Sequence, residues 1–136
     1  MRFEGANPHP GIAAEEREPG VSNYYAGNDR SKWRSGVPHY GRVRYSGVYP
    51  GVHAVFYGNP TDLEYDFVVD PGADPSRIRL AFRGAGQVTV DSSGALVLKA
   101  GDATIRNLRP VVTQDGKHVN GQWVLRGQHS AGFVVD

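Results

Sequence analysis

The sequence has 136 residues, enough for one domain with a hydrophobic core. Its 15 lysines and arginines balance 14 aspartates and glutamates to a net charge of +1, so no strong field favours nucleic acid as a partner. Eighteen glycines and nine prolines indicate frequent turns, and the absence of cysteine excludes disulfides and thiolate metal sites. No stretch approaches the roughly 20 apolar residues of a transmembrane helix, so no membrane insertion is expected.

The first 20 residues are expected to form an irregular arm. Segment 7–20 holds three prolines and one large aliphatic residue, a composition typical of a loop. From Val21 onward, apolar and polar residues alternate in short runs bounded by turn residues. This pattern predicts a single β domain over residues 21–136.

The strands of that domain are identified from their two-residue period, because alternate side chains of a strand point to opposite faces. Turn sequences join three pairs of these strands into hairpins, the last through Asp115-Gly116, a favoured type I′ pair. The hairpins are 52–57 with 63–69, 88–90 with 96–98, and 111–114 with 117–119. Further strands are expected at 78–82, 123–125 and 133–135, and Gly84-Ala85-Gly86 is interpreted as another hairpin turn. The sequence therefore predicts an all-β fold, an antiparallel β-sandwich or a partly open barrel-like sheet.

Long, ordered motifs after residue 20 also carry a family resemblance. They are Asn-Tyr-Tyr-Ala-Gly-Asn-Asp at 23–29, Val-Tyr-Pro-Gly at 48–51, Phe-Tyr-Gly-Asn at 56–59, Leu-Glu-Tyr-Asp-Phe-Val-Val at 63–69 and Arg-Pro-Val-Val at 109–112. The chain resembles the domain that precedes SBBP (seven-bladed β-propeller type) repeats in large exported bacterial proteins. Compared with that family, an upstream segment and a downstream strand are missing, so the chain is expected to be a truncated copy, incomplete at both ends.

The resemblance implies a secreted or cell-surface location, with the β-propeller repeats of a parent protein as partners. It supplies no catalytic residue that could be carried over. A truncated sheet is expected to leave edges open, which favours edge-strand self-association.

Candidate catalytic residues are sparse. Glu64 and Asp66 lie two apart on one strand, which places their β-carbons roughly 6.5 to 7 Å apart. That spacing is compatible with inverting glycoside hydrolysis. Any alternating strand generates such pairs, however, so a solvated face is the favoured interpretation. No serine lies in a nucleophile-elbow context, and no catalytic site is expected.

Metal ligands are equally unsupported by spacing. The five histidines lack the spacing that brings two imidazoles onto one metal. Several aspartates could offer oxygen ligands, but segment 70–75 does not match an EF-hand loop, and turn capping is favoured. No cofactor is expected, with calcium left open as an alternative. The aspartates concerned are Asp29, Asp62, Asp66, Asp70 and Asp74.

Aromatic residues concentrate in less than half of the chain, and most are expected in the core and at its margins. Trp33 lies in a predicted loop, 30–36, and is the first candidate for a ligand contact, together with Tyr24, Tyr25 and Tyr40. We therefore expect a non-catalytic structural or adhesion-type module that contacts a surface glycan or protein. A carbohydrate-binding module using exposed aromatics is the alternative, and a glycoside hydrolase-like enzyme is the third hypothesis.

Overall fold

The fold is described from a computed structural model of residues 1–136. It is all-β, with 60% of residues in strands and 4% in helices, and its antiparallel sheets do not close into a barrel, which confirms the expected fold class. Both helices are 3-10 turns of three residues, η1 (Arg30–Lys32) and η2 (Pro75–Arg77), and neither has the length or apolar character of a membrane-crossing helix. The strands are β1 (Arg2–Phe3), β2 (Gly11–Tyr24), β3 (Arg34–Tyr49), β4 (Val52–Gly58), β5 (Leu63–Val69), β6 (Arg79–Ala81), β7 (Gln87–Val90), β8 (Leu96–Ala100), β9 (Ala103–Asn107), β10 (Val112–Gln114), β11 (Lys117–Val119), β12 (Gly121–Gly127) and β13 (Ser130–Val135).

The chain divides into two compact units, where a single domain over 21–136 was expected. Unit 1 consists of Met1–Asn7, Tyr49–Gly51 and Val69–Asp136, and unit 2 consists of Pro8–Val48 and Val52–Val68. The units interleave along the chain because the short 49–51 turn is bonded within unit 1. The amide of Asp70 donates to the carbonyl of Gly51 at 2.8 Å, for example.

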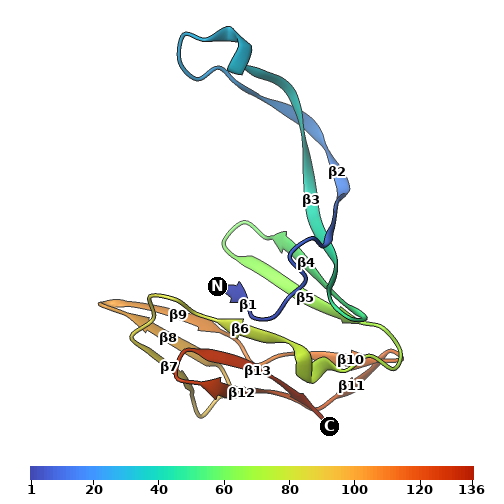
Figure 1. The fold of residues 1–136 in the computed structure, drawn as a ribbon, viewed down its shortest axis with the longest axis vertical. Coiled ribbons are helices and arrows are strands. Elements are labelled where there is room, and N and C mark those ends of the chain that lie inside the picture. The colour runs from blue at the N-terminus through green and yellow to red at the C-terminus, as the bar shows by residue number, and fades with distance from the viewer. The chain divides into compact units, whose positions relative to one another are not determined.

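Unit 1 contains most of the buried hydrophobic side chains, and unit 2 contributes Val48, Val52, Ala54 and Val55. Its four-stranded sheet has the order β1-β6-β13-β12, and a three-stranded sheet has the order β7-β8-β9. Strand β12 lies against β7, so the two sheets meet in a sandwich-like arrangement (Figure 1). The buried side chains include the three large apolar residues of the predicted 78–82 strand. The core of this unit contains Ile78, Leu80, Phe82, Val88, Ala95, Leu96, Val97, Leu98, Trp123 and Ala131.

Tyr49 ties the N-terminal segment to this sheet. Its hydroxyl lies 2.9 Å from the carbonyl oxygen of Glu4 and 3.1 Å from that of Arg79, and it is within reach of the Arg79 amide at 3.3 Å. The side chain is 5% exposed. Burial raises the pKa of the hydroxyl, so Tyr49 stays neutral and serves as a hydrogen-bonding post between β1 and β6.

The expected hairpins of unit 1 are confirmed, with one exception. Strands β7 and β8 pair from Gln87 to Val90, and β10 pairs with β11 around Asp115-Gly116, whose φ angles of 50° and 73° fit a type I′ turn. The exception is Gly84-Ala85-Gly86. It connects β6 to β7, which belong to different sheets, so it is a crossing between sheets and not a hairpin turn.

Unit 2 is a four-stranded sheet in the order β2-β3-β4-β5. The expected hairpin of β4 and β5 is present, and its loop is held by Asn59, whose amide donates to the carbonyl of Asp62 at 3.0 Å. A row of half-buried aromatic rings runs across three strands of this sheet, with ring centroids 5.7 to 6.0 Å apart. The row consists of Tyr45, Phe56, Tyr65 and Phe67.

The irregular arm predicted over residues 1–20 is wrong, because these residues contain β1 and most of β2. Strand β2 lies at the sheet edge, where Pro19 removes no hydrogen bond that the sheet needs. The pairing with β3 shifts register between Arg17 and Val21, around Pro19 and Gly20 (φ 99°), and Glu16 next to this stretch has a φ of 57°. An edge strand with irregularities of this kind tolerates the proline-rich composition that indicated a loop.

Candidate contact surface on the β2–β3 hairpin

The β2–β3 hairpin is the feature that distinguishes unit 2. Strand β3 has 16 residues, whereas its neighbour β4 has seven. The tight turn at 50–51 limits β4 to the last part of β3, so the part of β3 nearest Arg34 pairs with β2 alone. Figure 1 shows the two strands side by side up to the loop that joins them. We call residues 24–34 the hairpin tip and the paired strands below it the shaft.

No residue of the hairpin is fully buried until the end of β3. Strand β2 has no buried residue, and β3 has none before Val48. Several large apolar or aromatic side chains are instead open to solvent, with exposed fractions from 41% to 66%. They are Ile12, Val21, Tyr24, Tyr25 and Tyr40. A strand pair with this exposure adds little apolar burial to the fold.

The tip is ordered by its own hydrogen bonds. Asp29 caps η1, where its Oδ1 accepts from the amide of Ser31 at 3.0 Å and from the Ser31 hydroxyl at 2.7 Å. These bonds, the hydroxyl first, lower the pKa of the Asp29 carboxyl. Arg34 Nη1 donates to the carbonyls of Ser31 and Trp33. The loop therefore has a defined shape although it lies in solvent.

Trp33 is the centre of a small cluster of side chains in the tip. Its indole N–H donates to the carbonyl of Gly27 at 3.2 Å. The ring of Tyr25 lies 5.1 Å away, centroid to centroid, and the guanidinium carbon of Arg30 lies 5.3 Å from the Trp33 ring centroid. Trp33 is half-buried, whereas Tyr24 and Tyr25 are 57% and 58% exposed. The tyrosines, more than the tryptophan singled out from sequence, present their rings to solvent.

The structure brings together only part of the set proposed from sequence. Tyr25 and Trp33 are in contact, and Tyr24 is the cross-strand partner of Arg34. Tyr40 is paired with Arg17, six residues along β3 from Arg34, or about 20 Å at the rise of a strand. Tyr40 therefore belongs to the shaft and not to the tip.

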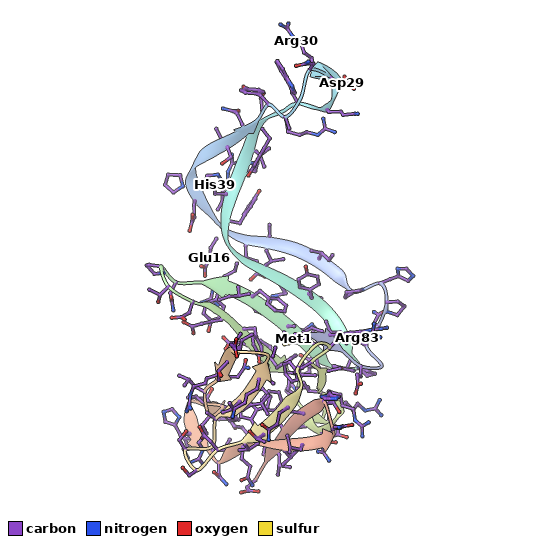
Figure 2. All side chains as sticks on the ribbon, turned by 90° about the vertical axis from the view of Figure 1, so that its left-hand side faces the viewer. Met1, Glu16, Asp29, Arg30, His39 and Arg83 are labelled. Atoms are coloured by element: carbon purple, nitrogen blue, oxygen red, sulfur yellow. The ribbon has the colours of Figure 1, made fainter.

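Charge is distributed unevenly along the hairpin. In the shaft, Arg44 Nε lies 2.7 Å from Glu15 Oε1, and Arg42 Nε lies 3.0 Å from Glu16 Oε1. In the tip, three cations are accompanied by the single carboxylate of Asp29, which Lys32 approaches to 3.6 Å. The three cations are Arg30, Lys32 and Arg34. Figure 2 shows Asp29 and Arg30 at the loop end of the hairpin, with Glu16 and His39 on the shaft.

Sequence reasoning missed these three cations, because it treated the aromatic residues alone as the signal. The run Arg-Ser-Lys-Trp-Arg at 30–34 places a basic residue on both sides of the tryptophan. The preceding Asp29 is a typical N-cap residue that could have indicated an ordered turn there. Together these two signals identify the tip.

The carboxylate pair on β5 lies on the surface. Glu64 Oε1 accepts from Asn59 Nδ2 at 2.6 Å, and Asp66 Oδ2 accepts from the Tyr57 hydroxyl at 3.1 Å. Both glutamate and aspartate are exposed. This geometry matches the solvated strand face that was favoured from sequence.

The other polar candidates take part in local contacts. His39 lies 2.6 Å from the Ser22 hydroxyl, and His53 Nδ1 accepts from the Gly47 amide at 3.1 Å. Asp74 caps η2 by accepting from the Ser76 amide at 2.9 Å, as the capping interpretation predicted. No three histidine, aspartate or glutamate side chains gather in a geometry that could hold a metal ion.

Unit 1 has a shallow depression with a volume of about 320 Å³. It is lined by Arg109, Pro110, Val111, Val112, His118, Val119 and Gly121. Arg109 at its rim is held by the carbonyl of Gly121 at 3.3 Å and by Asn120 Oδ1 at 2.6 Å. Its cation is therefore engaged within the protein.

Comparison with known proteins adds a family but no described relative. The model of a family described as Domain of unknown function (DUF7948) matches residues 1–136. No curated protein and no solved structure matches the chain.

Proposed function

We propose that this chain, which belongs to the DUF7948 family, is a non-catalytic structural or adhesion-type module of a bacterial surface or secreted protein. In this proposal the module accompanies β-propeller repeats of its parent protein, as the resemblance to the domain preceding SBBP repeats implies. The β2–β3 hairpin is its contact element.

The observation that carries the proposal is the exposure of this hairpin. Its strands of 14 and 16 residues contain no buried side chain before Val48, yet they present Ile12, Val21 and Tyr24 to solvent, and Tyr25 is exposed in the loop that follows. Apolar surface that does not serve the core is available for a partner. A long hairpin with an ordered tip suits contact with a partner away from the four-stranded part of the sheet.

Binding is favoured over hydrolysis by the setting of the carboxylates. A glycosidase needs its acid in an environment that displaces the pKa, typically a concave pocket. Glu64 and Asp66 are exposed and engaged by Asn59 and Tyr57 instead. The third hypothesis, a hydrolase, therefore has the least support.

Self-association through edge strands is proposed only at the two ends of β2, where a second copy of the chain could pair. The middle of this edge strand carries Glu16 and Gly20 at positive φ, with Pro19 between them. Irregularities, prolines and charges are the devices by which natural sheets prevent edge pairing. A second copy would have to pair outside this protected stretch.

A shortened hairpin tests the proposed contact element. Arg17 and Tyr40 are cross-strand partners in the same register as Glu15 and Arg42, so residues 18–39 can be replaced by an Asn-Gly turn without changing the register below them. Wild-type and shortened chains are coupled to beads and tested on three immobilised probes: the parent's repeat segment, polysaccharides and a second copy of the chain. We expect retention of the wild type on at least one probe and a loss of roughly tenfold or more on shortening, as for a central contact patch.

The circular dichroism spectrum and urea unfolding of the shortened chain serve as the folding control. Equal retention of both chains, or no retention of the wild type on any probe, would contradict a contact role for the hairpin.

A carbohydrate-binding module is the second candidate. It is favoured by the two solvent-exposed tyrosines at the tip, since aromatic rings stack on sugar faces.

A further inference from the structure

We infer that the hairpin tip, residues 24–34, binds an acidic polysaccharide. This inference rests on the proposed role of the hairpin as a contact element and names the class of ligand. Three properties of the tip carry it: exposed rings, an excess of positive charge, and a polar, hydrogen-bonded loop.

The rings provide the stacking surface. Tyr24 and Tyr25 expose more than half of their surface. Tyr25 is braced from within, because its ring rests on Trp33 at 5.1 Å and its hydroxyl lies 3.3 Å from the Ser35 hydroxyl. A braced ring loses little conformational freedom when a sugar stacks on it, which favours binding.

The charges select an acidic ligand. Arg30, Lys32 and Arg34 face one carboxylate, that of Asp29, so the tip carries an excess of two positive charges. The Lys32 side chain is 77% exposed. In the shaft, by contrast, Arg42 and Arg44 are each paired with a glutamate. The uronate carboxylates of an acidic polysaccharide could therefore pair with the cations of the tip, whereas Arg42 and Arg44 of the shaft are already paired with glutamates.

The polarity of the loop favours a polysaccharide over an anionic membrane as the ligand. A segment that lies in a lipid interface needs an apolar face rich in leucine, phenylalanine or tryptophan. The tip has no leucine or phenylalanine, and its single tryptophan is half-buried in contact with Tyr25 and Arg30. The loop between the aromatic residues consists of polar or small residues, among them Gly27, Asn28, Asp29 and Ser31. Such surroundings suit hydroxyl-rich sugars.

Affinity electrophoresis in gels containing polygalacturonate tests the stacking. The variant Tyr25→Ala should bind about tenfold more weakly than wild type, the loss expected for one stacked ring. The matched control Tyr40→Ala removes an exposed tyrosine of the same hairpin outside the tip and should stay within about twofold. Equal weakening by both variants, or none by either, would overturn the inference.

Two charge variants test the role of the positive charge at the tip. Arg30→Gln with Lys32→Gln should weaken binding to polygalacturonate by roughly fivefold and reduce its dependence on salt. Arg17→Gln, a cation of the shaft, is the control and should leave both unchanged. If Arg17→Gln weakens binding as much as the double variant, the attraction is diffuse and the tip is not the site.

Neutral dextran and phosphatidylglycerol vesicles complete the probe set. We expect little binding to either. Binding to dextran as tight as to polygalacturonate would overturn the acidic selectivity, and binding to the vesicles alone would identify a membrane surface instead.

Failure of this inference is distinguishable from failure of the proposed function. If polygalacturonate is not bound while the shortened hairpin still abolishes retention on another probe, the ligand class is wrong and the contact element stands.

Discussion

The two units differ in how their strands contribute to stability. Strand β6 in unit 1 has three residues, and its Leu80 is completely buried. Strand β2 in unit 2 has 14 residues and no buried side chain. Strand length and contribution to the core are therefore inversely related in these two elements.

Apolar burial and the proposed contact surface therefore lie in different parts of the molecule. Unit 1 concentrates apolar burial, the main favourable term in folding, around Ile78, Leu80 and Leu96. The β2–β3 hairpin relies on backbone pairing and on exposed ion pairs such as Glu16–Arg42, which contribute little. Substitutions should therefore affect stability in unit 1 and binding in the hairpin.

The largest stability effect is expected from Leu80→Ala. Removing a fully buried leucine leaves a cavity, and the free energy of unfolding should fall by about 2–5 kcal/mol. Ile12→Ala in the hairpin removes an aliphatic side chain of the same size that is 66% exposed, and it should change stability by less than about 0.5 kcal/mol. Urea unfolding followed by circular dichroism measures both. A similar loss for the two variants would remove the distinction between the regions.

The sequence predicted the core of unit 1 well because burial there is one-sided. Ile78, Leu80 and Phe82 alternate with Arg77, Arg79, Ala81 and Arg83, and this alternation is the pattern expected of a strand with one buried face. The sequence of strand β2 shows no such alternation of buried and exposed residues. The strand is held by pairing with β3 and not by burial, so its Glu-Arg-Glu-Pro segment at 16–19 was interpreted as an irregular arm.

The candidate site was predicted only in part for a related reason. The sequence places Tyr24, Tyr25 and Trp33 within ten residues, but the contact of Tyr25 with Trp33 depends on the closing of a hairpin whose first strand had not been identified. The half-buried state of Trp33 follows from that contact and from Arg30 above the ring. Neither contact can be derived from a two-residue period.

An intermediate effect is expected from Tyr49→Phe. The change removes the hydroxyl that lies between the carbonyls of Glu4 and Arg79 inside unit 1, and stability should fall by about 0.5–1.5 kcal/mol, the net contribution of one part-buried hydrogen bond. Tyr40→Phe removes an exposed hydroxyl of the hairpin and should be close to neutral. Urea unfolding of the two variants measures the difference. An equal loss of unfolding free energy would mean that the Tyr49 hydroxyl does not stabilise the fold.

The smallest effect should appear at low pH, where the two units carry equivalent aspartates. Asp91 accepts from the hydroxyl and amide of Ser93, as Asp29 does from Ser31. The Ser93 hydroxyl, followed by backbone amides and Arg106, lowers the pKa of Asp91 to about 2. Because this pKa lies below the unfolded value of about 3.9, the charged carboxylate stabilises the fold above pH 4, and this contribution is lost as the pH falls through 2.

Asp91→Asn removes that titration from the β7–β8 turn of unit 1. Its thermal midpoint should decline less steeply than that of wild type between pH 4 and pH 2. Asp29→Asn makes the same change in the hairpin tip, where local opening costs little and need not involve the core. Its midpoint should follow the wild-type curve. If the two variants flatten the curve equally, the tip unfolds together with unit 1, and the division between a stabilising unit and a contact hairpin is wrong.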